Sequence, residues 1–322
     1  MDDRPTGHLP VLPAECLELL TPSAGETILD CTAGLGGHAT ILAREVGVKG
    51  TLILNDLDPG NLASAEENVR DVLGDACPEV VTIHGPFDRA RLRLAERGLA
   101  ADCVLADLGF ASVQVDDPDR GLSFKNDGPL DMRLDPTSGP TAADLVAELN
   151  AQDLADVLYQ FGEERLSRRI ARKVVEERAS GPITTTSQLA EIVRSAVPKP
   201  RGKVRIDPAT RTFQALRIAV NDEIGCLERL LGAVRREAER HCAGTESEAG
   251  GGWLRDGARV AVIAFHSLED RPVKLAFREM ASEGIATALT KKPVRPTENE
   301  VAANPRSRSA RLRAVRLGRD GV

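Results

Sequence analysis

The sequence predicts an α/β fold in which a parallel sheet is interrupted by a long helical insertion. Over about the first 110 residues, short apolar runs alternate four times with helical segments, which is the pattern of a parallel sheet. Residues 141–197 then contain helices and no strand signal, and an apolar run at 259–265 returns to the sheet. We expect a discontinuous sheet domain over 1–115 and 208–322, and an inserted, mainly helical domain over 116–207.

The elements of the first half follow from apolar periodicity. Strands are expected at 27–29, 50–54, 80–84 and 102–106, and helices at 14–20, 39–46, 61–73 and 89–97. A long polar loop rich in Asp, Pro and Gly then covers 111–140. Loops of this length are usually functional or disordered. The Met and Leu residues of this loop indicate that it packs against the rest of the protein.

The second half begins with helices. They are expected at 141–149, 151–159, 163–179, 187–196 and, after a basic loop, from 208 or 209 to about 240. Thr141 and Ser187 are the expected N-caps. A mobile, Gly-rich connection at 241–252 precedes the strand at 259–265, a helix at 273–281 and an edge strand at 312–317.

Composition excludes several classes of protein. The chain has 322 residues with 42% hydrophobic and 28% charged side chains, as in soluble globular proteins. No apolar run approaches the roughly 18 residues of a membrane span, and the N-terminus lacks the apolar region of a signal peptide. The six cysteines are scattered without a CxxC pair, so we expect no disulfide, no metal site and a cytoplasmic location.

Positive charge is local although the net charge is −7. From residue 291 to 319 there are nine Lys or Arg against two Glu. The loop at 199–205 carries Lys199, Arg201, Lys203 and Arg205, and Arg211 follows it. Charged helix faces are usually only solvated, but phosphate contacts are the simplest use of this loop.

One stretch, ETILDCTAGLGGH from Glu26 to His38, has the parts of a nucleotide-binding crossover: a strand, a glycine turn and a helix. Gly34, Gly36 and Gly37 form the turn, with Asp30 four residues before the first glycine. This spacing suits S-adenosylmethionine better than a pyrophosphate, because the carboxylate would repel phosphates and attract the cationic methionine end. An ordinary glycine-rich turn in an α/β protein is the alternative.

Three further residues follow the other expected strands. Asp56, Phe87 and Asp107 come after the second, third and fourth strands, whose carboxyl ends face one crevice in a parallel sheet. Asp56 would hold ribose hydroxyls, Phe87 would lie against adenine, and Asp107 would sit where cofactor meets substrate. Solvated turn acids are the alternative reading.

The tetrapeptide that begins at Asp107 predicts the chemistry of the acceptor. Methyltransferases that act on exocyclic amines often have D/N-P-P-Y/F here, whose acidic or amide side chain accepts hydrogen bonds from the amine. This chain reads Asp-Leu-Gly-Phe and keeps only the Asp. We therefore expect Asp107 to orient an amine, unless it touches cofactor alone; no residue is identified as the proton acceptor.

The segment FHSLED at 265–270 places His266, Ser267 and Asp270 close together. The spacing does not match the G-x-S-x-G turn of a serine hydrolase. We expect a polar cluster that closes the substrate side of the crevice, with His266 and Ser267 toward the substrate. Helix capping by Ser267 with Asp270 is the alternative.

With these residues in view, the chain resembles the bacterial RsmH/MraW family of ribosomal RNA small subunit methyltransferases. The resemblance runs nearly from end to end. Its motifs are HLPVL (8–12), DCTAGLGGH (30–38), DLDP (56–59), HGPF (84–87), DLGFASVQVDDPDRGLSF (107–124), DGPLDMRLD (127–135), GEERLSRRIAR (162–172), ATRTFQALRIAVNDEIG (209–225), FHSLEDR (265–271) and NPRSRSARLR (304–313).

The resemblance implies a Rossmann-like class I methyltransferase sheet with an inserted helical domain that recognises RNA. The implied activity is transfer of a methyl group from S-adenosylmethionine to N4 of a cytidine in the decoding region of 16S rRNA, in the small ribosomal subunit. Implied cofactor contacts are Gly36, Gly37, His38, Asp56, Phe87, Asp107 and Gln114. Ala33 and Leu35 replace an aromatic residue and an Arg of the family motif, and Phe110, Ala111, Val113 and Val115 depart from a second motif.

Three rival functions remain at the sequence level. A DNA amino-methyltransferase shares the chemistry but should carry D/N-P-P-Y/F. An oxidoreductase should carry GxGxxG rather than GxGG. A non-catalytic RNA-binding assembly factor would need the basic segments without the crevice. The sequence leaves the oligomeric state open, with a homodimer as one candidate.

Overall fold

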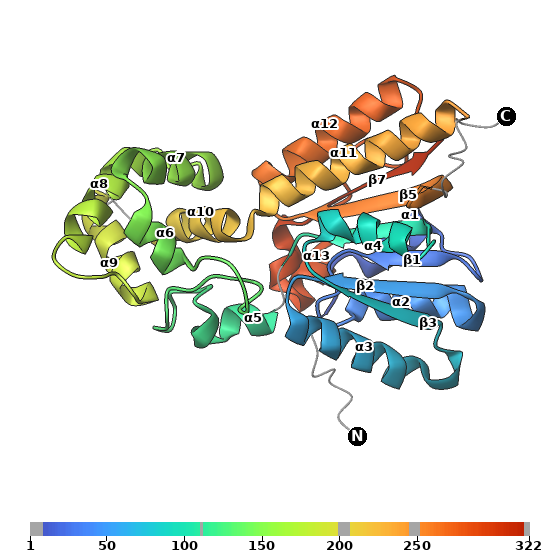
Figure 1. Ribbon diagram of the computed structural model, residues 1–322, viewed down its shortest axis with the longest axis horizontal. Helices are drawn as coiled ribbons and strands as arrows, with labels where there is room; N and C mark the ends of the chain where they lie inside the picture. Colours follow the sequence, from blue (N-terminus) through green and yellow to red (C-terminus); the bar gives the residue numbers. More distant parts are fainter. Residues whose placement is uncertain (1–8, 110–111, 199–206, 245–251, 319–322) are drawn as a thin grey trace. The chain divides into compact units, whose positions relative to one another are not determined.

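The computed structural model describes residues 9–109, 112–198, 207–244 and 252–318, apart from the side chains of 112 and 113. The chain divides into two compact units, which we call the sheet unit (Met1–Gly109 and Ile224–Val322) and the helical unit (Phe110–Glu223). Figure 1 shows the elements of both. Within the described residues, no helix is both long enough and apolar enough to cross a membrane.

The sheet unit contains a seven-stranded sheet in the order β3-β2-β1-β4-β5-β7-β6. The strands are β1 (Thr27–Asp30), β2 (Thr51–Asp56), β3 (Glu79–His84), β4 (Ala101–Asp107), β5 (Leu254–Ala264), β6 (Ala286–Ala288) and β7 (Arg311–Leu317). β1 to β5 pair in parallel, and β7 is antiparallel to β5 and β6. The predicted Rossmann-like sheet is confirmed, and its strand order reverses between β1 and β4, where such sheets bind ligands.

Helices cover both faces of this sheet. They are α1 (Pro13–Leu20), α2 (Gly37–Val46), α3 (Pro59–Leu73), α4 (Ala90–Glu96), α11 (Glu223–Cys242) and α12 (Ser267–Ser282). The short helix α13 (Glu298–Ala303) also belongs to this unit but buries no residue. Successive strand residues point to opposite faces, so Ile28 packs in one core cluster with Leu42 of α2, and Leu29 packs in the other with Leu227 of α11. Burial on both faces explains why the strands are continuous apolar runs.

The helical unit has its own core. It comprises α5 (Ser112–Asp116), α6 (Ala142–Glu148), α7 (Ala151–Gly162), α8 (Ser167–Arg178), α9 (Thr186–Ala196) and α10 (Ala209–Asn221). Leu130 and Met132 of the long polar loop are fully buried in this core, as predicted from their presence there. Thr141 caps α6 as predicted, through a capping box with Asp144.

Six predictions about elements are wrong. Two of them are late starts, because the helix expected from 273 begins at Ser267 and the strand expected from 259 begins at Leu254. The long helix from 208 or 209 to 240 is two helices, because Asp222 between α10 and α11 has a left-handed backbone with φ 50°. Thr185, not Ser187, caps α9, since its hydroxyl accepts from Gln188 N. β7 is an interior strand because the unpredicted β6 pairs with its outer side. The helix expected at 163–179 begins only at Ser167.

Candidate functional site

Three strands of the sheet unit end in an aspartate at the same edge. Asp30, Asp56 and Asp107 are the last residues of β1, β2 and β4. In the register of the parallel pairs, Asp30 lies opposite Leu105, two residues before Asp107. Phe87 begins a short 3-10 helix three residues after β3 and is half-buried against the core. The structure therefore brings together the residues that the sequence placed at the strand ends.

The glycine turn joins this edge to α2. Gly34 and Gly36 have φ values of +52° and +83°, which side chains rarely allow. A Cβ at Gly36 would lie 2.9 Å from the carbonyl oxygen of Ala65 in α3. Gly36 is thus required by packing against α3 as well as by the turn that the sequence predicted.

Asp56, at the end of β2, binds the glycine turn through a hydrogen bond. Its Oδ2 accepts a hydrogen bond from the Gly34 N–H at 2.8 Å, and its Oδ1 accepts from the Asp58 N–H at 2.8 Å. Burial raises the pKa of Asp56 to about 6, although these backbone bonds favour the charged form. Each oxygen retains a lone pair that could accept a further donor.

Asp30 is almost entirely buried, at 1% exposure. Its Oδ1 accepts from the Thr32 N–H at 3.1 Å, whereas its Oδ2 has no hydrogen-bond partner among the described residues. Burial, together with the charges of Asp107 and Asp56, raises the pKa of Asp30 to about 7 against the opposing effect of His38. Buried polar atoms without partners are rare and mark places where a ligand or water completes the bonding.

Asp107 is held from three directions. Its backbone N–H donates to Thr32 Oγ1 at 2.7 Å, and its Oδ1 accepts from the Gly109 N–H at 3.1 Å. Its Oδ2 lies 3.6 Å from Nε2 of the buried His38, a nitrogen without a hydrogen-bond partner in the described part of the chain. Thr32 was not among the site residues predicted from the sequence. Its position between Asp30 and the glycine turn could have indicated that it belongs to the site.

The segment after β5 closes around a buried glutamate. Glu269 is 2% exposed; its Oε2 accepts from the Phe265 and His266 N–H groups, and its Oε1 lies 3.0 Å from His266 Nε2. Asp270 instead binds Arg313 at 2.7 Å. Burial raises the pKa of Asp270, but the hydrogen bond and the positive charge of Arg313 lower it by more, so the pKa lies below its ordinary value.

This arrangement excludes the hydrolase reading of the segment and its capping alternative. Asp270 is engaged with Arg313, so it does not orient His266 as a triad acid would. His266, not Ser267, is the N-cap of α12, and Ser267 is the first helical residue. The Phe265 ring lies so close to Gly109 that a Cβ there would approach it within 2.9 Å, which ties this segment to the loop after Asp107.

The remaining candidates lie in the helical unit or outside the described residues. Gln114 is buried in α5. Arg211 in α10 donates from Nη1 to the Glu163 carbonyl oxygen at 3.3 Å. Lys199, Arg201, Lys203 and Arg205 lie outside the described residues.

Comparison with known proteins gives matches along nearly the whole chain. The model of the MraW methylase family matches residues 5–317. A protein of Acidobacterium capsulatum named ribosomal RNA small subunit methyltransferase H is 45% identical over 96% of this chain and 97% of its own length. A protein of the same name from Koribacter versatilis is 44% identical over 96% of this chain and 93% of its own.

Among solved structures, a SAM-dependent O-methyltransferase from Thermotoga maritima aligns with 96% of this chain and 66% of its own length. Its TM-score is 0.38 and its sequence identity 9%. The fold assignment therefore depends on the strand order of the sheet and on the family match.

Proposed function

The chain belongs to the MraW methylase family, and we propose that it uses S-adenosylmethionine to methylate N4 of a specific cytidine in the decoding region of 16S rRNA. The observation that carries the proposal is the near full-length identity of 42–45% to proteins named ribosomal RNA small subunit methyltransferase H. A ribosomal substrate implies a cytoplasmic enzyme.

The strand-end edge has the donors and acceptors that S-adenosylmethionine needs. Asp30, with a buried oxygen that lacks a partner, suits the ammonium of the methionine moiety. The spare lone pairs of Asp56 suit the ribose hydroxyls, and the ring of Phe87 offers an apolar surface to adenine. The turn formed by Gly34, Gly36, Gly37 and His38, together with Gln114, would complete the contacts.

When bound, S-adenosylmethionine supplies an electrophilic methyl group on its sulfonium, and the chain's residues have to position the acceptor. The N4 amine of cytosine is a weak nucleophile, because its lone pair is conjugated with the ring. Alignment of the nitrogen with the methyl group should therefore provide much of the acceleration.

Asp107 is the residue that we propose to orient the amine. Its carboxylate is held by the Gly109 N–H and lies beside His38, so its direction is fixed before the substrate binds. An N4–H donated to this carboxylate would hold the amine so that its lone pair, which lies perpendicular to the ring plane, can face the methyl group. As the N–C bond forms and the C–S bond breaks, the amine releases one proton. The cytidine has to be unstacked or presented unpaired in order to reach this edge.

RNA recognition is proposed for the helical insertion at 116–207, which includes the basic loop at 199–205, and for Arg211, which follows it. Lys199, Arg201, Lys203, Arg205 and Arg211 would contact phosphates. His266 and Ser267, which follow β5 at the same edge as Asp107, would lie beside the substrate base.

Labelled-methyl transfer tests the proposal. The purified chain is incubated with S-adenosylmethionine and either free 16S rRNA or assembled small subunits, and the RNA is digested to nucleosides. We expect label in N4-methylcytidine. Label on a carbon or on a ring nitrogen would contradict the proposed position, and label in DNA but not in rRNA would favour a DNA amino-methyltransferase.

A further inference from the structure

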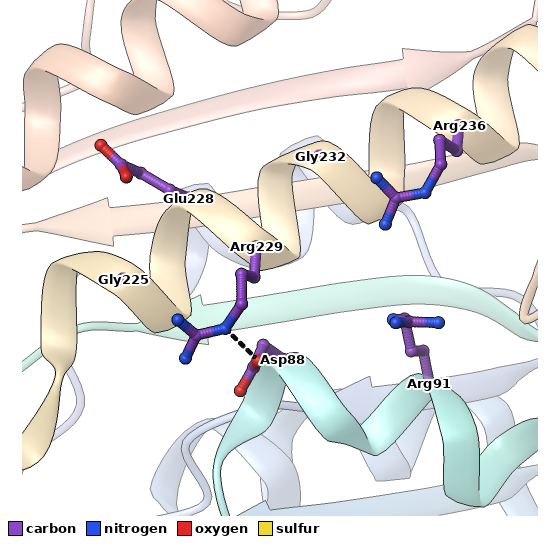
Figure 2. A pocket seen from close by; sticks show the side chains of 7 residues that line it. All are labelled: Asp88, Arg91, Gly225, Glu228, Arg229, Gly232 and Arg236. Atoms are coloured by element: carbon purple, nitrogen blue, oxygen red, sulfur yellow. Dashed lines mark hydrogen bonds and ion pairs between the residues drawn. The ribbon is translucent and has the colours of Figure 1, made fainter.

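A pocket of about 480 Å³ lies between α4 and α11 in the sheet unit. Its lining contains three arginines, two acids and two glycines: Asp88, Arg91, Gly225, Glu228, Arg229, Gly232 and Arg236. Figure 2 shows Arg229 and Arg236 directed from α11 toward α4, and Arg91 directed from α4 toward α11. Glu228 points away from the space between the two helices. We call this space the arginine groove.

The face of α11 that lines the groove alternates glycine with arginine. Gly225, Arg229, Gly232 and Arg236 are spaced by four, three and four residues, so they lie on one face of the helix. A glycine inside a helix costs about 1 kcal/mol relative to alanine. At Gly232 a Cβ would lie 3.4 Å from Arg236 Nη1, an ordinary contact distance, so this guanidinium lies directly beside the glycine.

Only one of the three arginines has its charge balanced within the groove. Arg229 Nε binds Oδ2 of the buried Asp88 at 2.6 Å. Among the described residues, Arg91 and Arg236 have no hydrogen-bond or ion-pair partner. By contrast, Arg235, the neighbour of Arg236 in the sequence, binds Glu239 and Glu283 on another face of α11.

We infer that the arginine groove binds the phosphodiester backbone of the RNA substrate, an inference that rests on the proposed function for the identity of the ligand. A guanidinium group can bind two oxygens of one phosphate through parallel hydrogen bonds. The guanidinium groups of Arg91 and Arg236 have no protein partner among the described residues, so they are available to bind phosphate in this way. Because the chain is acidic overall, with a net charge of −7, RNA contact has to come from such local sites.

The position and length of the groove suit a strand of RNA. Asp88 directly follows Phe87, so one end of the groove adjoins the strand-end edge. Arg229 and Arg236 are seven residues apart, or about 10 Å along the helix axis, which allows contact with more than one phosphate. RNA that enters the groove would continue from the cytidine at the edge along α4 and α11.

Paired substitutions on the same two helices test the inference. The test variant carries Arg91→Ala and Arg236→Ala. The control carries Arg93→Ala and Arg235→Ala, which remove the same charge from α4 and α11 but at arginines paired with Glu96, Glu239 and Glu283. Unfolding in urea, followed by Trp253 fluorescence, verifies that both variants fold.

The measurement is the affinity for a 16S rRNA fragment that contains the decoding region, without cofactor, between about 50 and 300 mM salt. We expect the test variant to bind at least about tenfold more weakly at low salt. The slope of log K against log salt should fall in magnitude by roughly 1.4 to 1.8, for two lost phosphate contacts. The control should match the wild type, and the affinity for S-adenosylmethionine should be equal in all three proteins.

Equal RNA affinity and salt slope in the test and control variants would overturn the inference. Saturable binding of inorganic phosphate that requires Arg91 and Arg236, with an unchanged RNA slope, would assign the groove to a free anion and also overturn it. Failure of the proposed function is distinguishable, because it would appear as the absence of N4-methylcytidine with the wild-type protein, whatever the salt slopes.

Discussion

Asp107 is the residue for which the geometry makes the sharpest functional prediction. Its carboxylate is oriented by Gly109 and lies near His38, and the change Asp107→Ala removes both oxygens that could accept a hydrogen bond from the amine. We expect kcat for methyl transfer to fall about 100-fold, because a misdirected amine loses the benefit of alignment. The affinity for S-adenosylmethionine, measured by calorimetry, should change much less.

Asp256→Ala is the matched control for that measurement. The Asp256 side chain is 80% exposed and belongs to the same sheet unit. The variant at Asp256 should transfer methyl groups at the wild-type rate. A wild-type rate in Asp107→Ala with normal cofactor binding would show that Asp107 does not orient the amine.

Asp30 makes stability depend on pH in a defined direction. Its pKa is about 7 in the folded chain against an ordinary value of 3.8. Below 3.8 both states are protonated, and between 3.8 and 7 only the unfolded state releases its proton. The free energy of unfolding should therefore fall as pH rises across this window, by up to about 1.4 kcal/mol per pH unit, and become constant above it.

Urea unfolding of the wild type and Asp30→Asn at several pH values between about 4 and 8 measures this contribution. The stability of the wild type minus that of the variant should decrease by on the order of 3 kcal/mol from the lower to the upper end of the window. Asp75→Asn, at an exposed carboxylate, is the control. A difference that stays flat across the window would contradict the assignment.

The turn between β1 and α2 carries a prediction about packing. Gly36 has φ +83°, and a Cβ there would lie 2.9 Å from Ala65 O. Gly36→Ala should lower the free energy of unfolding by about 2–4 kcal/mol, from left-handed backbone strain and displacement of α3. Gly98→Ala, with φ +64° and open space around it, should lose only about 1 kcal/mol. If urea unfolding showed the same loss of unfolding free energy in both variants, displacement of α3 would not contribute to the loss at Gly36.

The elements that the sequence predicted well are those that local patterning determines. The first four strands are apolar on both faces, and the aspartates that end three of them converge because parallel strands share an edge. These two facts alone yielded most of the strand-end site. Thr32 escaped prediction because it accepts from the Asp107 N–H, a distant backbone group that only the folded chain brings near. Glu269 bonds locally to the Phe265 and His266 N–H groups in a capping box, but the capping prediction named Ser267 and Asp270 instead.

The break between α10 and α11 illustrates what local patterning misses. Neither glycine nor proline interrupts the sequence there, yet the chain turns at Asp222. Asn221 donates to the Met132 carbonyl oxygen and accepts from the Leu134 N–H. These bonds to the long polar loop fix the end of α10, and they depend on residues nearly ninety positions earlier in the chain.

At the scale of the whole molecule, each unit has a hydrophobic core of its own. Two clusters flank the sheet, and a third lies within the helical unit. The chain also carries a natural reporter for one unit alone, because its single tryptophan, Trp253, is buried in the sheet unit. Unfolding of the sheet unit can therefore be followed by fluorescence.

Separate cores predict that the cofactor stabilises mainly the sheet unit, which carries all of the proposed cofactor contacts except Gln114. S-adenosylmethionine at 100 times its Kd should raise the unfolding free energy reported by Trp253 fluorescence by about 2.7 kcal/mol, because the folded sheet unit carries most of the proposed cofactor contacts. Hydrogen exchange of the α7, α8 and α9 amides should report the same stability with and without cofactor. If the cofactor raised the stability reported by those amides by the same amount, the two units would unfold together. If it did not raise the unfolding free energy reported by Trp253, the result would contradict binding at the strand-end edge.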